Sequence, residues 1–150
     1  MRLSSAQKLL PWAPLAIRLS LGVIFVAHGA QQLFGIWEGP GLPEPIGISR
    51  ATGRIPAYLI LIAAGTEFMG GIAVTVGLLT RLAALALALD MVVWIFKVHL
   101  INGFFLNWSL TPGKGHGYEY NLALLAMSIA LFLSGPGKLA LDHVLGFEEE

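Results

Sequence analysis

The chain has 150 residues, of which 56% are hydrophobic, and its nine basic and nine acidic residues give a formal net charge of zero. Charged residues make up only 12%, about half the usual share in a soluble globular domain, and no excess of positive charge suggests nucleic acid as a partner. The lack of cysteine excludes disulfides, thiol chemistry, iron–sulfur clusters and covalently attached haem. This composition indicates an integral membrane protein in contact with lipid.

Four apolar stretches approach the length of about 20 residues that a membrane-spanning helix needs. We expect helices at about 14–36, 57–79, 82–103 and 118–134. Trp12 and Trp37 bracket the first of these, as expected of aromatic anchors at the two membrane interfaces. The fourth helix is the weakest and ends at Gly135-Pro136-Gly137. The sequence thus predicts an all-α, four-helix membrane bundle that forms a single domain over residues 1–150.

The first helix is expected to be retained and not cleaved as a signal peptide. Its apolar run contains Arg18, is followed by Gln31 and Gln32, and lacks a small-residue cleavage site at a suitable distance.

The connections between the helices predict the topology. Residues 79–81 leave room only for a tight turn, so the second and third helices must be antiparallel neighbours. The two long connections, 38–55 and 102–117, then share one face of the membrane, and the termini share the other face with Arg81. Arg2 and Lys8 precede the first helix, which favours a cytoplasmic position for both termini.

Polar side chains from all four helices converge on the end of the bundle beneath the two long loops. Burying ionisable groups in a spanning helix costs about 2.5–3.5 kcal/mol each near its centre, so such groups usually face the bundle interior. The candidates for a binding site are His28, Gln31, Gln32, Glu67, His99, Asn102 and Glu119, with Arg18, Arg81, Asp90, Lys97 and Tyr118 in supporting positions. The alternative is a purely structural hydrogen-bonded network between the helices. Asp90 is expected to find its partner on another helix.

Metal binding is not expected, because no His-x3-His or Glu-x-x-His pair places two ligands on one helix. A haem b held by His28 and His99 is a lesser alternative.

Several short motifs occur in a specific order along the chain. They are His28-Gly29-Ala30-Gln31-Gln32-Leu33-Phe34-Gly35, Glu67 with Gly70-Gly71, Gly77 with Thr80-Arg81, Val98-His99, Gly103-Phe104-Phe105, Gly117-Tyr118-Glu119-Tyr120-Asn121, and Gly135-Pro136-Gly137 before Leu141-Asp142. Over about residues 14–143 the chain resembles the DoxX family of bacterial and archaeal four-helix membrane proteins, which is related to the DoxD subunit of thiosulfate:quinone oxidoreductase. Gln32 departs from the family's pattern, where a lysine is expected.

The resemblance implies a bacterial or archaeal inner-membrane protein associated with redox chemistry at the quinone pool. The leading hypothesis is a quinone-interacting subunit of a membrane oxidoreductase complex, with quinone as the cofactor and a partner protein as the source of electrons. Whether catalysis belongs to this chain stays open at this point. One alternative is a non-catalytic anchor or assembly subunit that docks a partner through the long loops. Another is a small transporter, which would require the chain to form a homo-oligomer.

Overall fold

The computed structural model describes residues 9–39, 41–42 and 55–148, and every regular element in these residues is a helix. The elements are a 3₁₀ turn η1 (Leu10–Trp12), α2 (Ala13–Phe34), α4 (Ala57–Val76), α5 (Thr80–Trp94), a π-helical turn η2 (Ile95–His99), a 3₁₀ turn η3 (Leu100–Asn102), α6 (Glu119–Ser134) and a short α7 (Leu141–Val144). The predicted all-α four-helix membrane bundle is confirmed. Most of the first long loop, and Arg2 and Lys8, lie outside the described residues.

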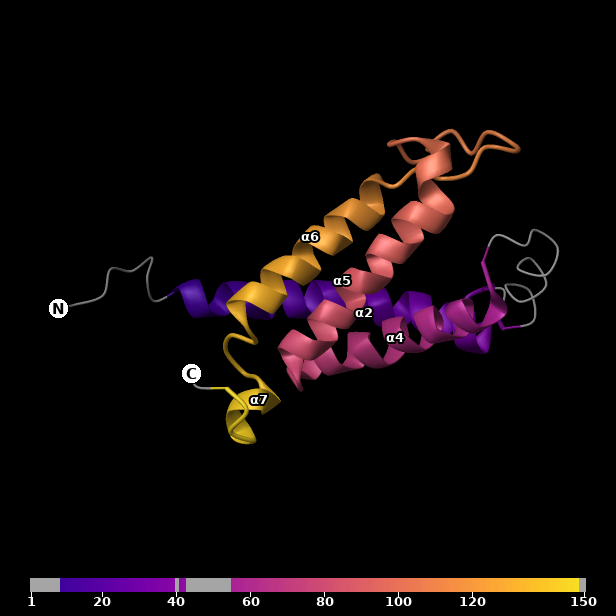
Figure 1. Ribbon diagram of the computed structural model, residues 1–150. Coiled ribbons are helices and arrows are strands. Elements are labelled where there is room, and N and C mark those ends of the chain that lie inside the picture. Colours follow the sequence, from indigo (N-terminus) through magenta and orange to yellow (C-terminus); the bar gives the residue numbers. More distant parts are fainter. Residues whose placement is uncertain (1–8, 40, 43–54, 149–150) are drawn as a thin grey trace.

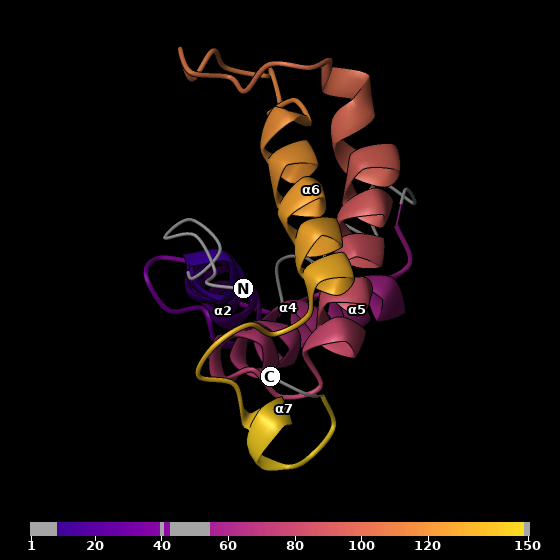
Figure 2. The ribbon, with the colours of Figure 1, turned by 90° about the vertical axis from the view of Figure 1, so that its left-hand side faces the viewer.

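The helices form two antiparallel pairs that diverge from one another (Figure 1). α2 packs along α4, α5 runs beside α6, and Figure 2 shows the second pair standing away from the first. The pairs meet at the end that contains the start of α2, the α4–α5 turn and α7, which we call the terminal end. They separate toward the opposite end, where residues 103–118 connect η3 to α6, and which we call the loop end.

Glycines allow the backbones of α2 and α4 to approach each other closely. A Cβ atom added at Gly29 would lie 2.4 Å from the backbone nitrogen of Phe68, and one at Gly71 would lie 2.7 Å from that of Val26. Only small residues permit such spacing between helices in lipid. The first pair is therefore tightly packed along its length.

The second pair changes its helical geometry near the loop end. The α5 pattern of hydrogen bonds gives way to a π-helical turn over Ile95–His99 and then to a 3₁₀ turn up to Asn102. π-turns insert extra backbone into a helix and change which way the following side chains face. The predicted third helix reached residue 103, so its length agrees closely with the structure, but this change of register was not predicted.

The terminal end is held together by charged side chains bonded to the backbone. Arg18 is 1% exposed and donates from Nη1 to the Pro136 carbonyl (2.9 Å) and from Nη2 to the Leu139 carbonyl (3.0 Å). The carboxylate of Asp142 accepts hydrogen bonds from the backbone nitrogens of Leu79 (2.5 Å) and Thr80 (2.9 Å) and so caps the start of α5. The segment after α6 is thereby fastened to the first three helices.

Arg81 caps the C-terminal end of α6 at the terminal end of the bundle. Its Nη1 donates to the carbonyls of Phe132 (2.5 Å) and Leu133 (3.0 Å) in the last turn of α6, and its guanidinium also forms an ion pair with Glu148. A cation at a helix C-terminus satisfies free carbonyls and complements the helix dipole.

The outer faces of the helices match a lipid environment. Large apolar side chains are more than half exposed on all four long helices, among them Val23, Ile62, Leu89 and Leu133. So much exposed apolar surface is unfavourable in water and favourable in lipid. In the described part of the chain, Leu10–Phe34, Ala57–Val76 and Thr80–Asn102 are long and apolar enough to span a membrane. α6 has 16 residues, about 24 Å of helix, and is shorter than the ~30 Å hydrocarbon core.

Candidate functional site

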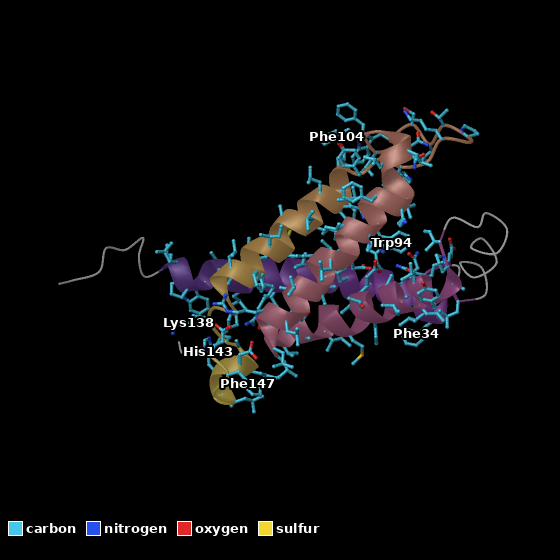
Figure 3. The ribbon with its side chains drawn as sticks, viewed as in Figure 1. Phe34, Trp94, Phe104, Lys138, His143 and Phe147 are labelled. Atoms are coloured by element: carbon cyan, nitrogen blue, oxygen red, sulfur yellow. The ribbon has the colours of Figure 1, made fainter. Side chains whose placement is uncertain are left out.

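A cavity of about 400 Å³ lies where the two helix pairs diverge. All four long helices and the 103–118 loop contribute to its wall. The lining residues are Phe25, His28, Gln32, Glu67, Met91, Trp94, His99, Leu106, His116, Gly117, Tyr120, Asn121 and Leu124. Figure 3 shows Trp94 at the place where α5 rises away from the α2–α4 pair. The cavity combines an apolar wall with several polar groups, as ligand-binding pockets usually do.

Two acidic side chains meet beside the cavity. Glu67 on α4 is 4% exposed and Asp90 on α5 is 8% exposed, and their carboxyl groups interact with each other across the helix interface. Gln32 on α2 donates from Nε2 to Oε2 of Glu67 (2.6 Å). Of the two acids, Glu67 reaches the cavity wall. In the described part of the chain, neither acid forms an ion pair with a lysine, arginine or histidine.

Polar atoms around this acidic pair are not fully bonded. Asp90 Oδ2 and Trp94 Nε1 are buried without a hydrogen bond of ordinary geometry within the described residues, although Trp94 interacts with the carboxyl groups of both Glu67 and Asp90. Unsatisfied buried polar atoms cost free energy, and in native structures they often mark functional positions.

The loop end of the cavity is built by backbone hydrogen bonds of the 103–118 loop. His99 Nδ1 lies 2.9 Å from the carbonyl oxygen of His116, and Asn102 Nδ2 donates to the same oxygen (3.1 Å). The backbone nitrogen of Asn107 donates to Nδ1 of His116 (3.2 Å). The side chain of Asn107 is buried and bonds to the backbone of Thr111 and Lys114, so it organises the fold of the loop. These bonds fix the His99 ring against the backbone of His116 and fix the His116 ring against that of Asn107, and both histidines line the wall.

Of the seven residues proposed from the sequence as a polar cluster, the structure brings His28, Gln32, Glu67 and His99 to the cavity. The other three lie nearby but do not line it. Gln31 turns to the carbonyl of Trp37 (3.5 Å), Asn102 holds His116, and Glu119 accepts a hydrogen bond from the backbone nitrogen of Leu106 (3.0 Å).

The residues proposed as supporting positions divide between the two ends. Arg18 and Arg81 lie at the terminal end, away from the cavity, and bond to backbone carbonyls. Asp90 has its interaction partner on another helix, in Glu67. Lys97 is exposed, and Tyr118 packs edge-on against Phe104 with ring centroids 5.3 Å apart.

Several lining residues were not singled out from the sequence. Trp94 lies four residues after Asp90, so the two share a helix face, but a tryptophan in an apolar helix gives no signal of its own. His116 lies in a glycine-rich loop, a position typical of a solvated residue, yet it contributes to the cavity wall. Tyr120 and Asn121 follow Glu119 in a polar stretch that could have indicated them. In the part of the chain that the structure describes, no group of three histidine or acidic side chains gathers to hold a metal ion.

Comparisons with known proteins show that this chain is similar to proteins from three bacteria. It is 34% identical to an uncharacterized membrane protein of Mycobacterium tuberculosis over 139 residues, which cover 90% of this chain and 82% of that protein. It is 32% identical over 128 residues to a Bacillus subtilis protein named "Putative oxidoreductase CatD", with 85% of this chain and 83% of that protein covered. An uncharacterized protein of Haemophilus influenzae is 27% identical over 141 residues, 94% of this chain and 96% of that protein.

No solved structure matches the chain significantly. The family pattern of DoxX matches residues 13–100, which include α2, α4, α5 and the histidine at the end of η2. This match covers more than half of the sequence, and the relatives extend the similarity over most of the rest. The chain belongs to the DoxX family of membrane proteins.

Proposed function

We propose that the protein is a quinone-interacting subunit of a redox complex in the bacterial or archaeal inner membrane, and that the cavity between the helix pairs binds the quinone ring. The observation that carries this proposal is the cavity itself, about 400 Å³ in volume and lined by both aromatic and titratable side chains. Pockets for small molecules typically have this size, an apolar wall and a few placed polar groups.

The lining suits the chemistry of a quinone. Phe25, Trp94 and Leu124 offer apolar and aromatic surface for a ring. Reduction of a quinone to a hydroquinone takes up two electrons and two protons, one proton at each carbonyl oxygen. His28 and Glu67 are groups that can exchange protons at the cavity wall.

Electrons must come from outside the residues that form the cavity. The side chains that line it do not form a redox centre that could supply two electrons. The chain also has no cysteine for an iron–sulfur cluster. We therefore propose a partner protein that carries the electron donor and docks near the loop end. The word oxidoreductase in the name of the Bacillus subtilis relative supports a redox setting. Haem b remains a lesser alternative, and an absorbance spectrum of the purified protein distinguishes it from quinone.

A binding measurement with a cavity-filling variant tests the proposal. The full chain in lipid nanodiscs is titrated with a decyl-substituted benzoquinone, and saturable binding is expected. His28→Trp places a bulky ring in the cavity and should weaken binding by tenfold or more. Val23→Trp, on the exposed lipid-facing surface of the same helix, is the matched control and should bind normally. The absence of saturable binding, or equal binding by His28→Trp, would contradict the proposal.

We also propose that both termini lie in the cytoplasm, which puts the 103–118 loop on the outer face. Because the chain has no native cysteine, single cysteines can report this directly. Ser109→Cys in the loop should react with a membrane-impermeant maleimide in intact cells, and Val144→Cys on α7 should react only after the cells are opened. The reverse pattern would invert the orientation.

An anchor or assembly role is a second candidate, favoured by the apolar tip of the same loop. Phe105, Trp108 and Leu110 are 70%, 78% and 74% exposed. A partner protein bound at this tip would cover them without requiring any ligand in the cavity.

A further inference from the structure

The two histidines at the loop end of the cavity have different hydrogen-bonding roles, and their backbone partners determine which is which. The partner of His99 Nδ1 is the carbonyl oxygen of His116, which can only accept, so Nδ1 of His99 carries a hydrogen. The partner of His116 Nδ1 is the backbone N–H of Asn107, which can only donate, so Nδ1 of His116 carries none.

The remaining ring nitrogens are therefore complementary when both rings are neutral. Nε2 of His99 is then a bare acceptor, and Nε2 of His116 carries the hydrogen and is a donor. Within the described residues neither Nε2 atom has a hydrogen-bond partner. Both residues line the cavity, so within this pair of histidines these are the two ring atoms available to a ligand there.

A hydroxyl group satisfies such a pair, but a carbonyl group does not. A hydroxyl oxygen donates its hydrogen to Nε2 of His99 and accepts one from Nε2 of His116. A carbonyl oxygen can only accept, so it would bond to His116 and leave the lone pair of His99 facing another lone pair.

We propose that His99 and His116 form an acceptor–donor pair that recognises a ring hydroxyl, so that the cavity binds the reduced form of its ligand, the hydroquinone, more tightly than the quinone. This inference rests on the proposed quinone site and specifies which redox form that site prefers. Nε2 of His99 accepts a hydrogen bond from the bound hydroxyl, and Nε2 of His116 donates one to the hydroxyl oxygen and so positions it. Tighter binding of the reduced form also makes the bound couple a stronger oxidant than the free couple.

Asparagine substitutions separate the two roles, because an asparagine side chain places its amide atoms where Nδ1 of a histidine lies and has nothing at the position of Nε2. His99→Asn keeps a donor for the His116 carbonyl and loses the acceptor in the cavity. His116→Asn keeps an acceptor for the Asn107 N–H and loses the donor in the cavity. Both variants are thus designed to retain the fold of the loop.

The experiment measures the affinity of the full chain in nanodiscs, under anaerobic conditions, for a decyl-substituted benzoquinone and for its hydroquinone. Wild type should bind the hydroquinone roughly tenfold more tightly, the effect of about one hydrogen bond, which corresponds to a shift of about 30 mV in the bound two-electron couple. His99→Asn should abolish this preference. His116→Asn should weaken both forms and leave the hydroquinone preferred.

Equal affinity of wild type for both forms, or a preference unchanged in His99→Asn, would overturn the inference and leave the quinone site intact. If neither form binds, the proposed function fails together with the inference. Thermal unfolding of both variants near the wild-type temperature confirms that the loop and the bundle remain folded.

Discussion

The two ends of the bundle both bury ionisable side chains, but these side chains have different partners at each end. At the terminal end, charges of opposite sign lie close together, since Asp142 interacts electrostatically with Arg18, and both side chains bond to backbone groups. At the loop end, two acidic side chains, Glu67 and Asp90, face each other without a cationic partner in the described residues, next to an open cavity.

A count of unsatisfied atoms does not separate the two ends. Within the described residues, each has two buried polar atoms without a hydrogen bond of ordinary geometry: Arg18 Nε and Thr80 Oγ1 at the terminal end, and Asp90 Oδ2 and Trp94 Nε1 at the loop end. What differs is whether the acidic side chain has a cationic partner and whether a cavity lies beside it. A neutralised, closely packed network stabilises the fold, whereas unbalanced polar groups around a cavity reduce stability unless a ligand uses them. The predictions below test this contrast.

The largest effect is expected from Arg18→Met at the terminal end. It removes the donors to the carbonyls of Pro136 and Leu139 and leaves Asp142 without its nearby cation. Loss of one partner from a buried charged network costs about 3–5 kcal/mol. Thermal unfolding in detergent, followed by circular dichroism, should show a large drop, and Arg18→Lys should fall between wild type and Arg18→Met. An unchanged unfolding temperature would mean that this network contributes little.

Asp142→Ala should have the next largest effect. The carboxylate accepts two backbone hydrogen bonds at the start of α5, and the loss of such a cap costs about 2 kcal/mol. Asp142→Asn keeps one acceptor oxygen and should recover part of this loss. Equal stability of the alanine and asparagine variants would show that the carboxylate acts through its charge and not through the cap.

Arg18 shows which features of the molecule could not be predicted from the sequence. Four helices and their order follow from the length of the apolar stretches, and a tight turn, expected at residues 79–81 and found at residues 77–79, forces α4 and α5 to be neighbours. The grouping of His28, Gln32, Glu67 and His99 could be predicted because helix topology brings them to one end. The role of Arg18 could not, since its partners lie 118 and 121 residues further along the chain.

The geometry of the cavity could not be predicted from the sequence either. It depends on the angle between the helix pairs, on the π-turn before His99 and on the fold that Asn107 gives to the loop. Each of these arises from tertiary contacts that no local pattern encodes. Glu119 illustrates the result, because it was a candidate for the binding site, and in the structure it does not line the cavity and bonds to the backbone of Leu106.

Glu67→Leu should behave differently from the substitutions at the terminal end. It removes one of two facing acids, so the free energy of unfolding should stay within about 1 kcal/mol of wild type or rise. Binding of the decyl-substituted benzoquinone should fall roughly tenfold, because a polar group on the cavity wall is lost. Glu67→Gln keeps an acceptor for Gln32 and should bind more tightly than Glu67→Leu. A stability loss as large as that of Arg18→Met would assign Glu67 to the structural network.

The smallest effect on the isolated protein is expected from Trp108→Ser at the loop tip. The side chain is 78% exposed, and the substitution should change stability by less than about 0.5 kcal/mol and leave quinone binding unaltered. The same variant tests the anchor alternative, because a partner docked on the tip would lose part of its contact. If Trp108→Ser abolishes the protein's redox activity in cells while Glu67→Leu does not, docking of a partner is the main role and the cavity is secondary. If the cavity variants alone abolish activity, the open and unbalanced loop end is the functional half of the molecule.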